Sequence, residues 1–507
     1  MTATIRRRAF LHTSLAAAGL GVLPGSMARA HGTSTSLVIG RAIEATTIDP
    51  ARTTRMSDFG SIALAYETLT SLRLADGVPT ADLAPALAAT CSSDDNVTWR
   101  FRLRAGARFA NGSAVDADAV ARSFARLFQA DQGPAKALSF VRNVSARDGE
   151  VEITLTAALP AFPLLLSLPM FGIVDARASD DPSWFATNSA GSGPYRLSSW
   201  HRGTEQIFTA ARDLPFDTVI FRTIRSSLSR VGELRQGDID FAESLSPDEA
   251  DLLAASPGVT IASGAGAALT YLEMNNQRAP FTDLRFRQAV DAALNREAML
   301  AHLLRGHGRI PAGLLPAGDT ASTRPRYDPH AAAALARAVG ASLTLTLNYI
   351  PADALTDALA VTIQSNLGDA GIPVTLQPLS ASSFGAKVRF AGDFDLALRD
   401  YTADFPDPWI VLDFLYASKN IGPSGNLSRY ASPTVDALLD RAASSLDAAP
   451  RAALYRDAEA AILADTPHAV LFCRDALIAA RSDLRGPMPS FWQPQIYPAA
   501  FLSRTLR

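Results

Sequence analysis

Tyr271–Arg296, YLEMNNQRAPFTDLRFRQAVDAALNR, carries the strongest structural signal in this sequence. It joins an apolar strand around Leu272 and Met274 to an asparagine-rich turn, a proline break and a helix. Thr282 or Asp283 is suited to cap that helix. The helix is predicted because its apolar residues recur at helical spacing: Phe286, Ala289, Val290, Ala293 and Leu294. The alternation of strand and helix predicts an α/β fold.

The same stretch resembles a known family. Asn275, Pro280-Phe281 and the run Asp283–Ala289 resemble the signature of family 5 solute-binding proteins, the extracytoplasmic receptors of peptide and nickel ABC importers. Two further segments resemble motifs of that family, in the same order along the chain. Ile48-Asp49-Pro50 is similar to its leucine-Asp-Pro turn, and Gly191–Tyr195 is similar to its Gly-Thr-Gly-Pro-Tyr element.

This resemblance implies a periplasmic binding protein-like fold with three discontinuous lobes. Two large α/β lobes close on the ligand by a hinge motion, and a smaller domain lies between them in the sequence. Residues 31–55, 188–269 and 479–507 are assigned to lobe I. Residues 56–187 are assigned to the middle domain, and residues 270–478 to lobe III. The resemblance extends over nearly the whole mature chain.

Residues 1–30 have the features of an export signal rather than of a folded segment. Arg6-Arg7-Arg8 precedes an apolar stretch from Leu15 to Leu23, and Ala28-Arg29-Ala30 provides a cleavage site. The apolar stretch is too short to span a membrane as a stable helix. The Arg7–Leu11 order resembles the twin-arginine type of signal, with a Sec signal carrying an extra arginine as the alternative. We expect a periplasmic protein.

Removal of residues 1–30 takes away four arginines and leaves 43 basic and 50 acidic residues, a net charge of −7. Because no block of basic residues is present, nucleic acid and anionic membranes are poor candidate partners. We expect a monomer whose protein partner is the ABC permease. The two cysteines, Cys91 and Cys473, are predicted to be unpaired small hydrophobic residues rather than a disulfide.

The sequence contains no familiar catalytic motif, so we expect no enzyme and no cofactor. H-E-x-x-H, C-x-x-C, G-x-x-x-x-G-K and G-x-S-x-G are all missing. His302 and His307 are five residues apart, one residue away from the spacing that pairs two imidazoles on a helix, so no metal site is predicted. Gly264-Ala265-Gly266 begins like a dinucleotide loop, but Leu269 replaces the third glycine, which predicts a turn instead.

The segment Arg399–Trp409 is the main candidate for ligand binding. It places several acids, aromatics and prolines at the end of an apolar strand, where ligands bind in α/β proteins. It resembles the family's Gly-Trp-x-x-Asp-Tyr-x-Asp-Pro loop, and by that resemblance Asp404 binds the α-amino group of a peptide. Tyr401 and Trp409 supply aromatic walls. Asp407 is predicted to form a turn.

Four further residues are predicted to contact the ligand. Asn275 and Asn276 end a strand near the expected hinge, and their amides either bind a peptide backbone or stabilise the turn. Glu44 and Thr46 follow the first strand and are expected to line the cleft from lobe I. Arg41 is a possible carboxylate partner.

The predicted function is therefore the capture of a peptide or a peptide-like amine between two lobes for delivery to a membrane permease. Three alternatives within the same fold are a receptor for a nickel chelate, an opine or an oligosaccharide. A sugar site should depend on stacking aromatics such as Trp409 and Trp492. An exported hydrolase is the less favoured alternative, because no nucleophile and base occur at a familiar spacing.

Overall fold

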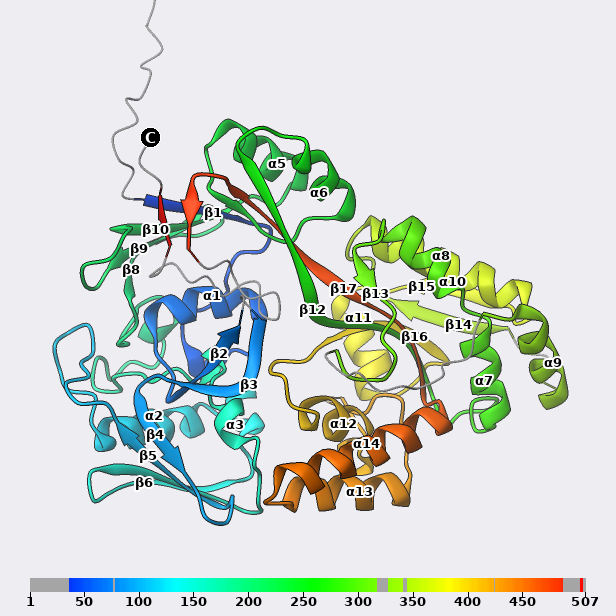
Figure 1. Ribbon diagram of the computed structural model, residues 1–507, viewed down its shortest axis with the longest axis horizontal. Coiled ribbons are helices and arrows are strands. Elements are labelled where there is room, and N and C mark those ends of the chain that lie inside the picture. Colours follow the sequence, from blue (N-terminus) through cyan, green and yellow to red (C-terminus); the bar gives the residue numbers. More distant parts are fainter. Residues whose placement is uncertain are drawn as a thin grey trace, which may run out of the picture. The chain divides into compact units, whose positions relative to one another are not determined.

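The computed structural model describes residues 36–75, 78–316, 327–340, 344–423, 425–486 and 502–504 (Figure 1). The signal segment, residues 1–30, and Trp492 lie outside the described residues. The fold is the expected mixed α/β arrangement, with one large sheet and helices along both of its halves.

The Tyr271–Arg296 stretch folds as predicted. Leu272 and Met274 lie in strand β12 (Val259–Met274) and are fully buried. Helix α7 (Leu284–Ala292) begins after Asp283, whose carboxylate accepts a hydrogen bond from the backbone N–H of Arg285. All five predicted apolar helix residues are at most 2% exposed. The helical spacing thus identified the buried face of the helix correctly.

The large sheet has eleven strands in the order β15-β14-β16-β12-β17-β11-β1-β10-β9-β8, with β13 paired to β17. Strand β1 is parallel to β10 and β11, and β14 is parallel to β15 and β16. The other pairs in this sheet are antiparallel. Besides β12, the bounds are β1 Ser36–Arg41, β8 Tyr195–His201, β9 Glu205–Ala210, β10 Thr218–Thr223, β11 Phe241–Ala242, β13 Gly308–Arg309, β14 Leu345–Tyr349, β15 Val374–Pro378, β16 Leu396–Thr402 and β17 His468–Arg481.

Helices connect strands in both halves of this sheet. Two of them begin at clear capping residues: a capping box at Ser246 and Glu249 starts α6, and Asp328 caps α9, whose C-cap is Gly340. The helices outside the middle domain, apart from α7, are α5 Ser227–Gln236, α6 Pro247–Ala254, α8 Arg296–Ala298, α9 Pro329–Val339, α10 Ala354–Asp369, α11 Ala381–Phe384, α12 Trp409–Tyr416, α13 Pro433–Ser444 and α14 Ala448–Asp465. Short 3-10 helices are η1 Pro50–Arg52 and η6 Ser418–Asn420, and short π-helices are η4 Met299–Leu303 and η5 Gly385–Phe390. Strand β18 Leu484–Arg485 pairs with β19 Ser503–Arg504 in a separate two-stranded sheet.

The predicted middle domain has its own sheet, ordered β4-β5-β7-β6, and a β2–β3 hairpin. Asp116 caps α2 by accepting a hydrogen bond from the backbone N–H of Ala119. Burial alternates along β5, with Trp99 and Phe101 inside. The elements are α1 Met56–Ala65, β2 Thr70–Ala75, β3 Val78–Pro85, β4 Ala88–Ser92, β5 Thr98–Leu103, α2 Ala117–Ala130, α3 Gly133–Ala137, β6 Val141–Arg147, β7 Glu150–Leu155, α4 Phe162–Leu165, η2 Pro169–Phe171 and η3 Trp184–Ala186.

Strands β12 and β17 carry the sheet from the strands of lobe I to those of lobe III, and Figure 1 shows them running side by side. Each continues without interruption through a predicted lobe boundary, at residue 269 in β12 and residue 478 in β17. The prediction of a turn at Gly264–Gly266 is wrong, because this segment lies inside β12. A side chain at Gly266 would lie 2.5 Å from the carbonyl oxygen of Arg474, so glycine permits the close approach of the two strands.

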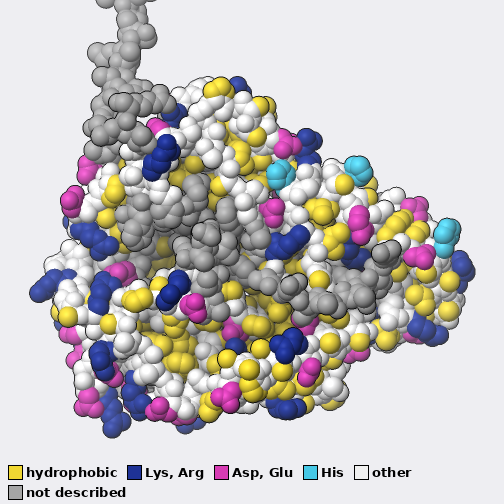
Figure 2. Space-filling model, viewed as in Figure 1, with side chains coloured by type: hydrophobic (Ala, Val, Ile, Leu, Met, Phe, Trp, Pro, Cys, Tyr) yellow, Lys and Arg dark blue, Asp and Glu magenta, His cyan; other side chains and the backbone are white. Residues whose placement is uncertain are grey.

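The buried apolar residues form several cores. One contains α7, α9, α10 and their strands, and two others lie along the lobe I strands. The largest joins the middle domain to residues of lobe III, including Phe405. Both cysteines are unpaired, as predicted, with Cys473 buried and Cys91 partly buried. On the face shown in Figure 2, basic and acidic side chains are interspersed.

Candidate functional site

The Arg399–Trp409 segment is held at both ends. Strand β16 continues to Thr402, and the backbone N–H of Ala403 donates to the carbonyl of Ala267 at 3.2 Å. At the other end, Asp407 accepts hydrogen bonds from the backbone N–H of Trp409 at 2.9 Å and from Arg451 at 2.7 Å. The turn predicted for Asp407 is confirmed by the first of these contacts. Asp404 therefore lies on a short loop whose two ends are held by hydrogen bonds at Ala403 and Asp407.

Asp404 lies in surroundings that disfavour its charge. Its side chain is partly buried, and burial raises the pKa of the carboxyl from 3.8 to about 6. The pKa of Tyr401 is raised well above its ordinary value, first by burial and then by the nearby negative charge of Asp404. A desolvated carboxylate is stabilised by a positive partner, so this position favours a cation.

Aromatic residues flank this acid along the chain. The hydroxyl of Tyr401 donates to the carbonyl of Ile410 at 2.6 Å, and its ring stacks on Phe414 with centroids 5.8 Å apart. Trp409 and Phe405 stack with centroids 6.5 Å apart and an interplanar angle of 13°. Tyr401 and Trp409, both predicted as walls, thus stand on the two sides of Asp404 in the chain.

A basic group that the sequence did not single out lies beside the same strand. Arg399 donates to Glu273 at 2.9 Å, and its guanidinium lies 5.8 Å from the centroid of the Tyr271 ring. Burial, followed by the charge of Arg399, lowers the pKa of Arg389, so the two guanidinium groups repel each other electrostatically. The hydroxyl of Tyr271 is buried and has no hydrogen-bond partner.

The carboxylate of Glu273 neutralises part of the positive charge of these arginines. Glu273 is fully buried, with Arg399 on one oxygen and the Nε2 of His468 at 2.8 Å from the other. Burial raises the pKa of Glu273, but the combined effect of His468 and Arg399 is larger and the pKa is lowered. Arg399 is thus paired with Glu273, whereas Arg389 donates a hydrogen bond to the carbonyl of Pro423 at 3.5 Å, so Arg389 keeps a positive charge that favours an anion.

This basic cluster was missed because the sequence distinguishes none of its members. The chain has 47 basic residues, most of them arginines, and most arginines lie on the surface. The available signal was the position of Arg399 at the end of the same apolar strand that leads to Asp404. Arg389 lies in the π-helix η5, and only the folded chain lets the charge of Arg399 act on it.

The two asparagines use their side-chain amides within the protein. The Nδ2 of Asn275 donates to the carbonyls of Gly392 and Phe394. The Nδ2 of Asn276 contacts three carbonyl oxygens, including that of Pro467 at 3.1 Å. Of the two roles that the sequence left open, the geometry favours turn formation. Contact with ligand stays a prediction for both residues.

The residues predicted from lobe I lie after β1 and also have internal partners. Glu44 accepts from the indole N–H of Trp200 at 3.0 Å and from Gly203 at 2.9 Å. Thr46 donates its hydroxyl to Asp58 at 2.8 Å and is exposed. These contacts fix the loop, and its role in the cleft stays a prediction.

Arg41, the possible carboxylate partner, is 1% exposed. It donates to Ser61 at 3.2 Å, its guanidinium lies 3.6 Å from the centroid of the Phe221 ring, and Glu243 is 3.7 Å away. These contacts give Arg41 an internal role, and its contact with a ligand carboxylate stays a prediction.

No group of three or more His, Cys, Asp or Glu side chains is arranged to hold a metal ion in the part of the chain that the structure describes. Within the same part, no helix has the length and hydropathy needed to cross a membrane.

Comparison with known proteins agrees with this geometry. Residues 82–423 match the family model for bacterial extracellular solute-binding proteins, family 5 middle. The probable D,D-dipeptide-binding periplasmic protein DdpA of Escherichia coli (strain K12) is 30% identical over 469 residues, which cover 89% of this chain and 90% of DdpA.

Solved structures agree on the fold. The periplasmic binding protein DppA from Helicobacter pylori, in complex with the peptide STSA, superimposes with a TM-score of 0.81 at 21% identity and covers 93% of this chain and 98% of its own. The dipeptide-binding protein from Pseudoalteromonas sp. SM9913, in complex with Met-Leu, gives a TM-score of 0.79 at 21% identity and covers 93% and 100%. The chain belongs to the family 5 bacterial extracellular solute-binding proteins.

Proposed function

We propose that this protein is the periplasmic receptor of an ABC importer and that it binds a short peptide by its two termini. One observation carries the proposal: Asp404, whose charge is disfavoured by burial, follows the end of β16, and the same strand carries Arg399, whose charge acts on Arg389. Asp404 receives the ligand ammonium, and the two arginines receive its carboxylate. Tyr401 and Trp409 form the walls between them.

The spacing suits a small zwitterion. Asp404 follows Arg399 by five positions in the chain, and five extended residues span at most about 17 Å. A ligand with both charges is thus able to reach both groups, whereas a neutral sugar would leave both charges unpaired. The curated relative is named for D,D-dipeptides, which supports D-Ala-D-Ala and L-Ala-L-Ala as the first ligands to examine.

The proposal also covers the partner, the fate of the ligand, the oligomeric state and the export route. The permease is the protein partner, as the family implies, and the ligand leaves chemically unchanged. The protein is a monomer exported to the periplasm by the twin-arginine route. Changing Arg7 and Arg8 to Lys should retain the full-length precursor in the cytoplasm, because the arginine pair is recognised by a receptor. Normal secretion of that variant would assign the signal to the Sec type.

Calorimetry with four forms of one peptide tests the ligand assignment. The forms are the free dipeptide, the N-acetyl dipeptide, the dipeptide amide and the doubly blocked compound. The free dipeptide should bind most tightly, and blocking either end should weaken binding. Equal affinity for all four forms would reject capture by the termini. Mass spectrometry of the mixture should find the dipeptide intact; cleavage that follows the protein through purification would identify a hydrolase instead.

A further inference from the structure

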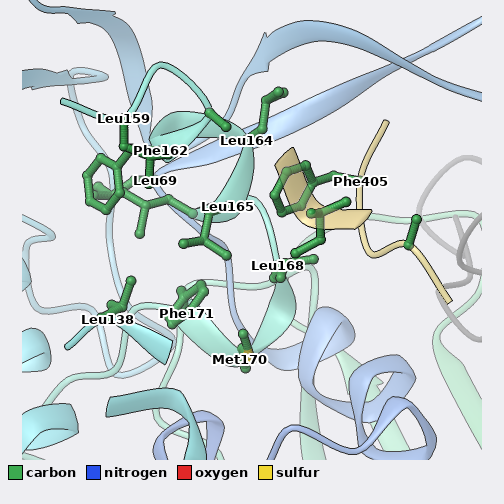
Figure 3. Close-up of a cluster of buried hydrophobic side chains, with 14 of the residues drawn as sticks. Leu69, Leu138, Leu159, Phe162, Leu164, Leu165, Leu168, Met170, Phe171 and Phe405 are labelled. Atoms are coloured by element: carbon green, nitrogen blue, oxygen red, sulfur yellow. The ribbon is translucent and has the colours of Figure 1, made fainter. Parts of the chain in front are cut away.

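Phe405, the residue directly after Asp404, connects the acidic loop to the middle domain. Its side chain is fully buried, and its ring faces Leu164, Leu165 and Leu168 (Figure 3). The leucines come from α4 and the segment that follows it, whereas Phe405 comes from the loop between β16 and α12. We name Leu164, Leu165 and Leu168 the leucine socket. The ring therefore joins two segments that are about 240 residues apart in the chain.

The middle domain is itself tied firmly to lobe I. The guanidinium of Arg126 donates to both carboxylate oxygens of Asp49, at 2.8 and 2.6 Å, and Asp49 is fully buried. The backbone N–H of Gly193 also donates to the carbonyl of Ala65 at 3.0 Å. A side chain at Gly193 would lie 2.4 Å from Ala65, so the packing there depends on glycine. The socket is thus fixed to lobe I.

The Arg126–Asp49 ion pair and the apolar contact of Phe405 differ in the free energy needed to separate them. Separating Arg126 from Asp49 would leave a buried charge without its partner, which is strongly unfavourable. Withdrawing an apolar ring from the socket leaves no hydrogen-bonding group unsatisfied and costs only the apolar area that returns to water. The Phe405 contact is therefore suited to form and break as lobe III moves relative to lobe I.

Asp404 is held between two fixed neighbours. Ala403 is bound to β12 through its backbone, and Phe405 is enclosed by the socket. Charged groups need placement to about 0.5 Å for an optimal contact with a ligand. We propose that Phe405 is a positioning residue, which sets the Asp404 carboxylate against the ligand ammonium only when its ring occupies the leucine socket of the middle domain.

This inference rests on the proposed function and adds the middle domain to the ligand site. Closure of the lobes and binding of the ligand ammonium are then coupled, because the Phe405 ring enters the leucine socket as the Asp404 carboxylate reaches the position in which it contacts the ammonium. Phe405 touches no ligand in this arrangement. A change at Leu168, which lies on the other domain, should then weaken binding of the ammonium in the same way as a change at Phe405.

The test uses calorimetry on the full mature protein with L-Ala-L-Ala, D-Ala-D-Ala and their N-acetyl forms. Phe405→Ala should weaken binding of the free dipeptide about tenfold or more, while the weaker binding of the N-acetyl form changes by less than about threefold. Phe405→Leu should restore most of the affinity. Leu168→Ala should show the same selective loss, and the double variant should lose less than the product of the two single losses.

Other results would overturn the inference. Equal losses for the free and acetylated forms would mean that Phe405 acts only through general stability, and unchanged affinity would mean that the socket contact is irrelevant to binding. Thermal unfolding without ligand identifies any variant that is not folded, in which case Phe405→Leu and Leu168→Ala decide the question. Failure of the proposed function is a separate result, since the wild-type protein would then show no preference for the free amine.

Discussion

Asp49 and Arg126 form a bidentate ion pair across the junction between lobe I and the middle domain, with oxygen–nitrogen distances of 2.8 and 2.6 Å. Asp49 is fully buried, and the guanidinium of Arg126 also lies over the ring of Phe185 at 3.9 Å. Asp49 belongs to the Ile48-Asp49-Pro50 turn. This turn is therefore a structural joint, and its acid fixes how the middle domain attaches to lobe I.

Arg126→Met should destabilise the protein by about 3 kcal/mol, because it leaves the buried carboxylate of Asp49 without its main partner. Urea unfolding measures the change. Arg102→Met is a matched control, since Arg102 forms an exposed ion pair with Glu150 at 2.9 Å and should change the free energy of unfolding by less than about 1 kcal/mol. Similar values for the two variants would contradict a structural role for the buried pair.

Asp404→Asn should reduce affinity while increasing the stability of the unliganded protein. Losing the partner of a trapped ammonium costs about 3–5 kcal/mol, or roughly two to three and a half decades of affinity. Burial raises the pKa of Asp404 from 3.8 to about 6, so the folded state disfavours the charged form. This cost is absent below pH 3.8, grows as the pH rises, and is complete above about pH 6.

At pH 7 the asparagine variant should therefore unfold with a free energy higher by at most about 3 kcal/mol. Asp407→Asn is the contrasting variant, because Asp407 is paired with Arg451 at 2.7 Å. It should lose about 2 kcal/mol of stability and little affinity. If Asp407→Asn lost the affinity instead, amine capture would belong to that acid.

The affinity for a free dipeptide should depend on pH. Only the ionised form of Asp404 attracts an ammonium, and its pKa is about 6. Affinity should be nearly constant above pH 7 and should fall by up to about tenfold per unit below pH 6. The N-acetyl dipeptide should show no such fall. Calorimetry of both ligands between pH 5 and pH 8 separates this effect from a general loss of folding at low pH.

The sequence predicted those features that depend on neighbours along the chain. Periodicity and a capping residue located α7, because local hydrogen bonds and one apolar face determine such a helix. The turn at Asp407 was predicted for the same reason. Resemblance to the family supplied the overall fold, which no local pattern contains, and the lobe boundaries stay a prediction.

Features that depend on distant segments were not predicted. Gly264–Gly266 has the composition of a turn, yet it is part of β12 because β17 pairs with it and needs a close approach at Gly266. Arg389 looks like any other arginine until the fold lets the charge of Arg399 act on it. The socket around Phe405 likewise requires the middle domain to meet lobe III. Such contacts are set by tertiary packing, which overrides local preference.

Arg389→Gln is the sharpest test of carboxylate binding. Arg399 is less suitable for substitution, because its loss would leave Glu273, which is fully buried, with only His468 as a partner. Arg389 is partly buried and faces the same cluster, so its replacement removes one positive charge with less effect on folding. The free dipeptide should bind about tenfold to a hundredfold more weakly, as expected for the loss of a charge-assisted hydrogen bond.

The dipeptide amide provides the internal control for Arg389→Gln. It carries no carboxylate, so its affinity should be nearly the same for the wild-type protein and the variant. Arg285→Gln is the matched control on the protein side, since Arg285 is exposed and pairs with Asp283 on the surface. This variant should bind both compounds like the wild type. An equal loss of affinity for the dipeptide and its amide in Arg389→Gln would show that Arg389 supports the fold of the site and does not receive the carboxylate.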